Sequence, residues 1–505
     1  MAALRERNVS NDLGKEGPKE DNLSVGAKGG AIAFIMKVAS AALALLNQIV
    51  LARILGANGV GEVLLAISVV KVSSQIAKFG MEETLMRFVP VYVDNNDPGR
   101  LKGTIHFAMK FCILVSVIFA LVILIFSKFI AINIFHSEML LKLLPVMAIA
   151  IPAGVIRDVT GGIMKGYKDT YKALLPEGLI SPFFRLAVFL ILTLKAVSSF
   201  YAAIAFITGE VVSMFLSMKF LSHKLTAVKS AEKQSDYGKV LKVAYTIIFA
   251  SFSMYLFAQT DVFIIGMLTN TKMVGIYGIA AKLVFLVYFP AYAFAAIMPP
   301  IFSSIYESGD YKELNRVTRR SIRWIFSMAM PIILMLVLEG RFVLRYFYGP
   351  EFETGYTVLL ILTAAYMAST STGIVGLFLQ MTGQHKVFMK LNMLFLSMNV
   401  VLNFILVSTI GMAGAAIATA FCIVSLQVMC AIIIYKRFSI ISLPEGFAFD
   451  ILFIAAVLIL HWALSYAEIS IGPHLLLAGA LTVYLWKSLK NHDIPWRLLI
   501  DKKIT

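Results

Sequence analysis

Long runs of apolar residues, separated by short polar gaps, extend from about residue 30 to residue 487. A helix that crosses about 30 Å of hydrocarbon needs about 20 such residues, and each run is close to that length. The pattern therefore predicts an all-α, polytopic membrane protein with about fourteen transmembrane helices. We expect these helices at residues 30–53, 58–80, 104–127, 140–163, 172–194, 199–221, 243–267, 273–300, 321–344, 355–379, 387–409, 412–435, 447–466 and 471–487.

Composition supports a membrane protein. Hydrophobic residues make up 59% of the 505 residues, charged residues make up 15%, and the mean hydropathy is +0.83. Soluble domains average about 25% charged residues. Lipid must therefore be the solvent for most of the chain.

Lys and Arg alternate strongly between the two sides of the predicted membrane domain. With the N-terminus inside, 31 of them fall in cytoplasmic loops and tails, and seven fall in the opposite loops. Because cytoplasmic loops carry the Lys and Arg excess, this predicts a multi-pass protein of the cytoplasmic membrane with both termini in the cytoplasm. A single misplaced helix would destroy the alternation.

The net charge of +16 does not indicate a nucleic-acid partner, because the basic residues are not gathered in one patch. Cys112, Cys422 and Cys430 lie in apolar runs, and no Cys or His spacing fits a metal site. We expect no metal, no disulfide and no cofactor. Residues 1–24 are polar and of mixed charge, which predicts a disordered cytoplasmic tail and no cleaved signal peptide.

The chain also repeats itself weakly. Residues 50–70 align with 261–284 when Gly61 is placed on Gly275, and MKGYKDTYKALL aligns with MTGQHKVFMKLN. An even number of helices per repeat predicts two parallel lobes with the substrate between them. The expected organisation is a tail (1–24), an N-lobe (25–221), a cytoplasmic linker (222–242), a C-lobe (243–440), two appended helices (441–488) and a tail (489–505).

Seven cations lie within the predicted helices or at their inner ends. Each would cost about 2.5–3.5 kcal/mol at a helix centre that faces lipid, so each must face water or a partner. These cations are Lys37, Lys71, Lys78, Lys110, Arg157, Arg185 and Lys282.

Their spacing selects a smaller set as candidate substrate-binding residues. Lys71 and Lys78 share one helix face with Gln75, and Arg185 shares a face with Glu177 in a helix that contains two prolines. Lys282 lies about three residues from the repeat equivalent of Lys71. We therefore predict a cationic lumen formed by Lys37, Lys71, Lys78, Arg185 and Lys282.

Structural explanations remain open for several of these cations. Lys78 and Lys110 are near enough to the cytoplasmic surface to snorkel. Arg157 is followed by Asp158, which favours a local pair. A buried ion pair of Arg185 with Glu177 or Glu210 is the main alternative to a substrate role.

Polar residues in the second half are candidates for ion coupling. Gln259 and Asp261 lie in the outer part of the helix at 243–267, although Asp261 also suits a helix-end cap. Asn392, Asn399 and Asn403 share a helix face, which is typical of hydrogen bonds between helices.

A cavity with several cations and few unpaired acids favours an anionic cargo. Lys binds phosphate as a point charge, and Arg binds it through two donors. These residue types predict a phosphate-bearing cargo. They do not predict which phosphate-bearing molecule is carried.

Three segments resemble polysaccharide biosynthesis flippases of the O-unit (Wzx-type) branch of the multidrug/oligosaccharidyl-lipid/polysaccharide exporter superfamily. They are LARILGANGVGEVLLAISVVKVSSQIAKFGMEETLMRFVP, QTDVFIIGMLTNTKMVGIYGIAAKLV and GQHKVFMKLNMLFLSMNVVLNFILV. The resemblance covers roughly residues 25–440. It implies two six-helix lobes, two extra helices, and alternating access that carries a polyprenyl-(pyro)phosphate-linked oligosaccharide outward.

The resemblance also implies roles for particular residues and partners. The related lipid II flippases use cations on helices 1, 2 and 8 for the pyrophosphate, and here those helices carry Lys37, Lys71, Lys78 and Lys282. The expected partners are a lipid-linked saccharide, membrane lipids and other polysaccharide-assembly proteins, and the expected state is a monomer.

Two other functions are alternatives to a flippase. A cation-coupled multidrug antiporter of the same fold would place carboxylates in the first or seventh helix, and Asp261 keeps that alternative open. A membrane enzyme of polysaccharide assembly would need a large outer loop or an acidic metal motif, and the predicted outer loops are short and lack one. We therefore expect a transporter and not an enzyme.

Overall fold

The structure is a computed structural model that describes residues 19–226, 237–295, 298–440, 443–444, 447–466, 479 and 484. Every element within these residues is helical, which confirms the all-α prediction. The elements are α1 (Lys19–Ala77), α2 (Met81–Asp94), α3 (Pro98–Lys128), η1 (Phe129–Ile134), α4 (Glu138–Met147), α5 (Ala150–Gly166), α6 (Thr170–Leu175), η2 (Pro176–Ile180), α7 (Ser181–Thr193), α8 (Ser199–Thr226), α9 (Tyr237–Leu268), α10 (Thr271–Phe294), α11 (Met298–Glu307), α12 (Tyr311–Val343), η3 (Leu344–Tyr348), η4 (Pro350–Gly355), α13 (Tyr356–Thr372), α14 (Val375–Met381), α15 (His385–Ile410), α16 (Met412–Phe438) and α17 (Phe447–Tyr466).

Most of these helices are long and apolar enough to cross a membrane. Among the described residues, nine helices meet that condition, and two bent pairs raise the number to 11. The first candidate span covers 44 residues, Phe34–Ala77, and contains a non-helical Gly56 with φ 66° and ψ −177°. This segment combines the predicted helices 30–53 and 58–80, because glycine tolerates the positive φ that reverses the chain.

The remaining predicted helices have clear counterparts. The helices expected at 140–163, 172–194 and 355–379 are each interrupted, at the α4–α5, η2–α7 and α13–α14 breaks. The last two interruptions coincide with prolines or a positive-φ glycine, Pro176 and Gly373. The predicted helix 447–466 matches α17, and most of the predicted helix 471–487 lies outside the described residues.

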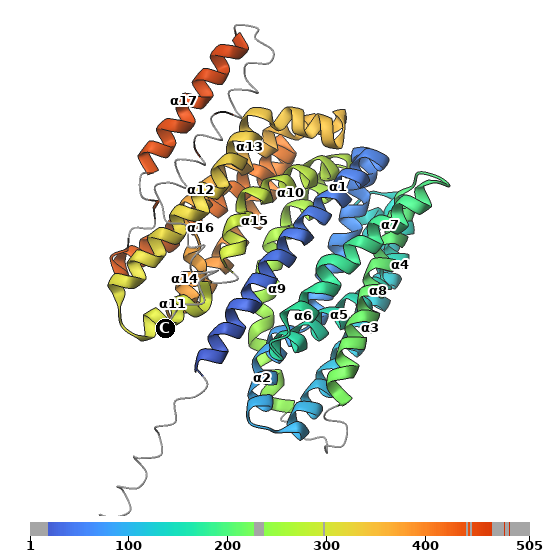
Figure 1. Ribbon diagram of the computed structural model, residues 1–505. Helices are drawn as coiled ribbons and strands as arrows, with labels where there is room; N and C mark the ends of the chain where they lie inside the picture. Colours follow the sequence, from blue (N-terminus) through green and yellow to red (C-terminus); the bar gives the residue numbers. More distant parts are fainter. Residues whose placement is uncertain are drawn as a thin grey trace, which may run out of the picture.

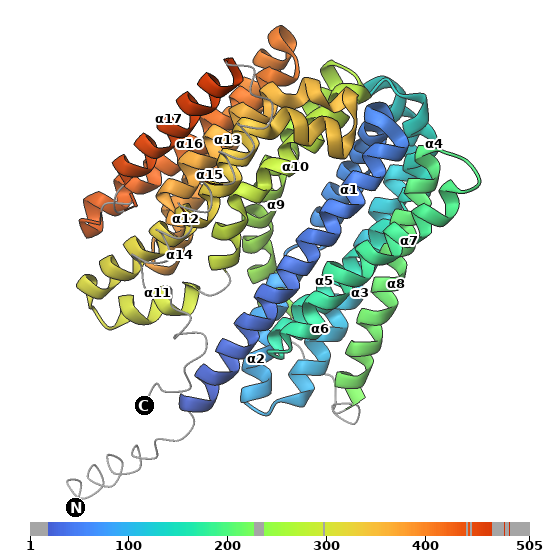
Figure 2. The same cartoon turned by 45° about the horizontal axis from the view of Figure 1, so that its top comes forward.

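The helices form two lobes that lie side by side. Figures 1 and 2 show α2 to α8 on one side and α10 to α17 on the other, with α1 and α9 between them. The chain rises through the first part of α1, turns at Gly56 and descends, so that α2 lies near the start of α1 (Figure 1). We call the two ends of the molecule the Gly56 end and the α2 end.

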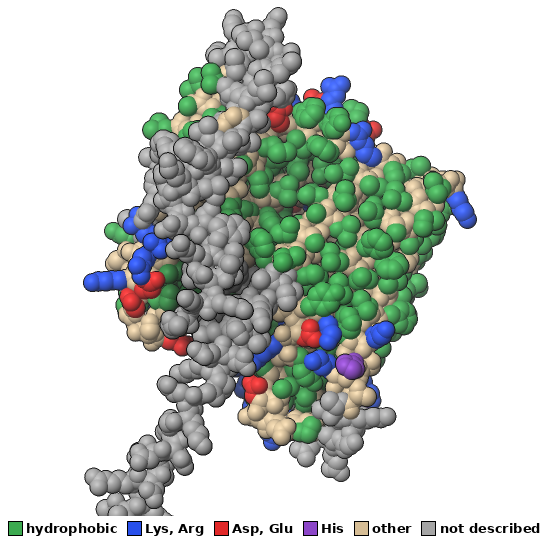
Figure 3. Space-filling model, viewed as in Figure 1, with side chains coloured by type: hydrophobic (Ala, Val, Ile, Leu, Met, Phe, Trp, Pro, Cys, Tyr) green, Lys and Arg blue, Asp and Glu red, His purple; other side chains and the backbone are tan. Residues whose placement is uncertain are grey.

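The surface has the polarity of a membrane protein. Figure 3 shows apolar side chains across the middle of the visible face, and charged side chains gathered near its two ends. Many large apolar side chains of the described residues are exposed, among them Leu114, Leu121 and Ile125 of α3. Such a belt would be unfavourable in water, and it matches a hydrocarbon core about 30 Å thick.

The two lobes touch most closely where α1 crosses α10, near the Gly56 end. A Cβ added at Gly61 would overlap the carbonyl oxygen of Thr271, and one added at Gly275 would overlap the carbonyl oxygen of Ala57. Each glycine thus faces the carbonyl group four residues before the other glycine. This reciprocal contact joins the two glycines that the sequence repeat aligned, as expected near a twofold axis.

Polar contacts surround this crossing. The Ala57 N–H donates to Oε2 of Glu351 (3.1 Å), and Arg53 Nε donates to the Phe347 carbonyl oxygen (2.9 Å). The Thr271 hydroxyl donates to Oδ1 of Asn58. Groups from both lobes therefore close the Gly56 end in this conformation.

Helix α9 belongs to both lobes. Its first turns supply Val240 and Ala244 to an apolar cluster with Met81, Leu85 and other N-lobe side chains. Its last turns place Ile264 and Ile265 in the larger cluster that includes α10. The segment 243–267 was expected wholly within the C-lobe, and its inner half packs instead on the N-lobe.

The expected tail and linker overlap with helices. Helix α1 begins at Lys19, within the predicted tail 1–24, and α8 and α9 cover parts of the predicted linker 222–242. Residues 227–236, which complete that linker, and the predicted tail 489–505 lie outside the described residues.

The glycine crossing makes a testable prediction. Gly275→Val should separate α1 from α10 and lower the melting temperature in detergent, since overpacking typically costs about 1–3 kcal/mol. Gly238→Ala is the control, because a Cβ there meets nothing within 4 Å. An unchanged melting temperature for Gly275→Val would show that the close contact is absent in the folded protein.

Candidate functional site

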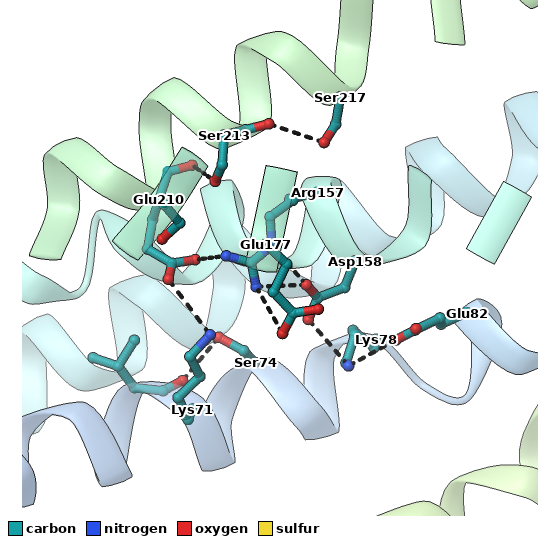
Figure 4. A network of polar contacts seen from close by, with 12 residues as sticks. Lys71, Ser74, Lys78, Glu82, Arg157, Asp158, Glu177, Glu210, Ser213 and Ser217 are labelled. Atoms are coloured by element: carbon teal, nitrogen blue, oxygen red, sulfur yellow. Dashed lines mark hydrogen bonds and ion pairs between the residues drawn. The ribbon is translucent and has the colours of Figure 1, made fainter. Parts of the chain in front are cut away.

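A charged network fills the N-lobe between α1, α5, α8 and the η2–α7 segment (Figure 4). Lys71 of α1 points at α8, and Lys78, one residue past the end of α1, points at α5. All four acids of the network lie on other elements, although Glu82 of α2 is only four residues from Lys78. They are Glu82, Asp158, Glu177 and Glu210.

The centre of the network is a buried arginine with two carboxylates. Arg157 of α5 is 2% exposed, and it donates to Oδ1 of Asp158 from Nε (2.9 Å) and from Nη2 (2.6 Å). Its Nη1 donates to Oε2 of Glu210, which is 1% exposed. The local pair of Arg157 with Asp158 is confirmed, and Glu210 extends it to α8.

Glu210 also binds two further cations. Its Oε1 lies 3.5 Å from Nζ of Lys71 and 3.3 Å from Nη2 of Arg185. The Arg185 guanidinium stacks 4.4 Å from the centre of the Phe206 ring, one helical turn before Glu210. The expected alternative of a pair between Arg185 and Glu210 is therefore present, and Lys71 shares it.

Lys78 does not snorkel to the surface. Its Nζ lies 3.0 Å from Glu82 and 3.1 Å from Asp158, and it is shielded from solvent. Lys165 of α5 reaches the other oxygen of Glu82 at 2.9 Å. Lys110 is exposed on α3 and lies outside the network.

Local backbone irregularity presents Glu177 and Arg185 to this network. Pro176 lacks an amide hydrogen, and the chain from Pro176 to Ile180 forms a π-helical turn. Glu177 lies there, 63% exposed and 3.9 Å from Nη2 of Arg157. We expected few unpaired acids in the cavity, and these four acids are paired with N-lobe cations, whose charge they largely balance.

Lys282 faces the network from the other lobe. Lys282 lies well inside α10, about 16 Å from its first residue, Thr271, at 1.5 Å per residue. Its side chain is nevertheless exposed. The positive charge of Arg185 in the N-lobe is near enough to repel that of Lys282. Among the described residues, Lys282 forms no hydrogen bond or ion pair.

Lys37 lies apart from this group, towards the α2 end. Its Nζ is 3.8 Å from the centre of the Tyr292 ring of α10, and 3.5 Å from the Tyr292 carbonyl oxygen. It therefore contacts the opposite lobe through an aromatic ring. Of the five predicted lumen cations, the structure joins Lys71, Lys78 and Arg185 in the network, places Lys282 within the influence of Arg185, and leaves Lys37 apart, on the Tyr292 ring.

A second polar cluster lies inside the C-lobe around Asp261 of α9. The carboxylate is 7% exposed and accepts hydrogen bonds from Asn403 Nδ2 (3.0 Å), the Thr419 hydroxyl (2.7 Å) and the Tyr277 hydroxyl. The side-chain oxygens of Asn399 and Asn403 are buried there without a hydrogen-bond partner. Asp261 is thus a packed residue between three helices and not a helix-end cap.

Gln259 belongs to a different contact. Its Oε1 accepts a hydrogen bond from the Ser68 hydroxyl of α1 at 2.8 Å. It therefore links α9 to the N-lobe, two residues before Asp261. The structure separates the two residues that the sequence grouped for ion coupling.

The described residues contain no group of three His, Cys, Asp or Glu side chains that fits a metal ion. Cys112, Cys422 and Cys430 are buried and unpaired by disulfides. The two clusters differ in charge: the first holds the partly exposed cations Lys71 and Arg185 around one carboxylate, and the second holds one buried carboxylate among amide and hydroxyl groups.

Sequence reasoning named Asp158, Glu177 and Glu210 as possible partners of Arg157 or Arg185, and it did not name Glu82. Acids are as costly inside a membrane as cations, and the same argument from cost would have selected Glu82 as well. Lys78 and Glu82 are four residues apart, a spacing that could have indicated this pair. Arg157 and Glu210 are 53 residues apart on different helices, and spacing along one helix carries no signal for such a pair.

Comparisons with known proteins agree with this description. The family model described as "Polysaccharide biosynthesis protein" matches residues 50–357. The putative O-antigen transporter of Shigella flexneri is 24% identical over 385 residues, which cover 73% of this chain and 88% of that protein.

Solved structures with the same fold include transporters of two kinds. The lipid II flippase MurJ in an inward closed conformation aligns with a TM-score of 0.68 at 16% identity, over 90% of this chain and 99% of that one. An inward-facing multidrug transporter of the MATE family aligns with a TM-score of 0.67 at 15% identity, over 82% and 98%. These likenesses confirm the membrane-transporter fold, and they do not distinguish the two cargoes.

The buried network makes a stability prediction. Arg157→Gln should lower the free energy of unfolding by about 3–5 kcal/mol, because Glu210 and Asp158 lose their shared buried partner. Urea or thermal unfolding in detergent measures this, with the exposed Lys195→Gln as the control. Equal stability of the two variants would contradict the ion-paired geometry around Arg157.

Proposed function

Because this chain belongs to the polysaccharide biosynthesis protein family, we propose that it is a flippase for a polyprenyl-(pyro)phosphate-linked oligosaccharide. It moves this cargo across the cytoplasmic membrane by alternating access, in the assembly of a polysaccharide or another cell-surface glycan. No covalent chemistry is required, and the protein acts as a transporter and not as an enzyme.

One observation carries this proposal: Lys71 and Arg185 share a single oxygen of Glu210 at 3.5 and 3.3 Å, so neither cation is fully neutralised. Lys282 of the other lobe has no ionic partner among the described residues, although the charge of Arg185 is near enough to repel it. An anion bound among these cations relieves the repulsion. A phosphate supplies that charge and accepts hydrogen bonds from Lys and Arg side chains. A carrier built of two lobes binds its cargo between them.

The cycle starts with the lobes in contact at the Gly56 end. The head group enters from the α2 end, past Lys37, and its phosphates reach Lys71, Arg185 and Lys282. The contact between Gly61 and Gly275 then opens while the α2 end closes, and the lipid tail remains in the bilayer throughout. The α2 end faces the cytoplasm, which is the orientation that the Lys and Arg distribution favours.

The cargo is tested by reconstitution in proteoliposomes with a polyprenyl-pyrophosphate-linked oligosaccharide. Lys71→Ala and Lys282→Ala should each slow flipping about tenfold, equivalent to about 1.4 kcal/mol, because each removes a charge that binds phosphate. Lys128→Ala, an exposed lysine at the Gly56 end, is the control.

Normal flipping by both lumen variants would contradict a cationic binding site. The same liposomes test the antiporter alternative: efflux of a cationic dye that Asp261→Asn abolishes, without any flipping of the lipid, would replace the flippase by a multidrug carrier.

The cluster around Asp261 is proposed as the site of a coupling monovalent cation. It offers one carboxylate and two buried amide oxygens without partners, Asn399 Oδ1 and Asn403 Oδ1. Neutral oxygens with a single negative charge suit a monovalent ion, since divalent cations usually take more carboxylates. Asp261 would hold the ion, and the bond of Gln259 with Ser68 joins its helix to the other lobe.

Ion coupling has its own test. Wild-type flipping should rise with a Na⁺ or proton gradient across the liposome, and Asp261→Asn should remove that dependence and leave a basal rate. Asp450→Asn, which changes another buried carboxylate, in the appended helix α17, should retain it. A gradient response in Asp261→Asn as large as in wild type would exclude this site.

A further inference from the structure

Glu210 is a single carboxylate that serves three cations from three different segments. Oε2 is taken by Arg157, and Oε1 is shared between Lys71 and Arg185 at 3.5 and 3.3 Å. Figure 4 shows Arg157 and Lys71 reaching Glu210 from two sides. One oxygen that serves two cations neutralises neither completely.

The three cations are not equivalent. Arg157 is 2% exposed and keeps two further hydrogen bonds to Asp158. The side chains of Lys71 and Arg185 are 26% and 28% exposed. Arg185 Nε is buried with no hydrogen-bond partner, so this residue retains an unused donor. Lys71 and Arg185 are therefore the cations that remain available to another anion.

We propose that Glu210 is an internal counter-anion, which holds Lys71 and Arg185 in the empty carrier and gives them up to the phosphates of the cargo. This inference rests on the proposed function and adds a positioning residue to it. Glu210 itself stays on Arg157 throughout, so it does not need to touch the cargo.

The exchange is favourable because the cargo offers more charged oxygens than Glu210 does. A pyrophosphate presents several charged oxygens, whereas Lys71 and Arg185 now share one. Each cation brings multiple donors, three for Lys and five for Arg, and most are unused at present. The Phe206 ring beneath both cations, 4.4 Å from Arg185 and 6.0 Å from Lys71, lets them shift without leaving an attractive surface.

The competition has a consequence for release. Binding is weakened by the interaction with Glu210 that the cargo must displace, and the same interaction recovers Lys71 and Arg185 when the cargo leaves. A carrier that binds its cargo too tightly gains affinity and loses turnover. Glu210 therefore lowers the affinity for the cargo and raises the turnover rate.

The experiment compares Glu210→Gln with wild type, using inorganic pyrophosphate as the probe. Titration calorimetry on the full chain in detergent, at fixed salt, should show a Kd about tenfold lower for Glu210→Gln, because a competing charge is removed. In proteoliposomes both KM and the maximal flipping rate should fall. A purely structural role for Glu210 would leave KM unchanged or raise it.

Two further variants decide between these roles. Adding Lys71→Met to Glu210→Gln should cancel most of the gain in affinity, since the freed lysine supplies it. Asp450→Asn is the matched control: Asp450 is a fully buried carboxylate paired with Arg323, and its loss should leave pyrophosphate affinity unchanged. If Glu210→Gln fails to fold, Glu210→Asp replaces it, and a smaller gain in affinity of about threefold is expected.

The outcomes are distinct from those of the cargo test. A Kd for Glu210→Gln, or for Glu210→Asp in its place, that equals or exceeds the wild-type value overturns the exchange, as does the absence of pyrophosphate binding to wild type. Absence of flipping by wild type overturns the proposed cargo, and the comparison of pyrophosphate affinities still decides the role of Glu210.

Discussion

Charged side chains inside a bilayer must be paired or must reach water, and this requirement organises the N-lobe. The ammonium groups of Lys71 and Lys78 and the guanidinium groups of Arg157 and Arg185 meet carboxylates from other helices. Because Arg157 and Glu210 are almost fully buried, each depends on the other to offset a desolvation cost of several kcal/mol. The packing of α1, α5, α7 and α8 is therefore tied to one ionic network, and the cations that face the lumen are extensions of it.

The fold was largely predictable from hydropathy, and the site was predictable only in part. Apolar runs predict the positions of helices such as 447–466 directly. In lipid, the backbone N–H and C=O groups of such a run must form hydrogen bonds within the run itself, as in a helix. They do not show that α9 divides its packing between the lobes, since both halves are equally apolar. The cost of burial selected Lys71, Arg185 and Lys282. It offered Glu210 only as one of two possible partners of Arg185 and gave no partner for Lys71, because ion pairs between helices leave no periodic trace along either one.

The repeat explains why one sequence alignment located the closest contact between the lobes. Residues on a twofold axis meet their own equivalents, and only glycine allows two helix backbones to approach as α1 and α10 do. Gly61 and Gly275 are therefore constrained by the symmetry and by the crossing together. The charges obey no such symmetry: the N-lobe carries the ion-pair network, whereas the facing part of α10 carries Lys282 without an ionic partner among the described residues.

This asymmetry bears on how an alternating carrier returns without cargo. Such a carrier must close over an empty lumen as well as a full one, and unbalanced charge would make the empty closure costly. Carboxylates within the N-lobe balance most of its cations, so only a small excess of positive charge faces the opening. Lys282 adds to that excess from the second lobe, and it approaches Arg185 most favourably when phosphate lies between them. The same few charges therefore permit empty closure and favour loaded closure.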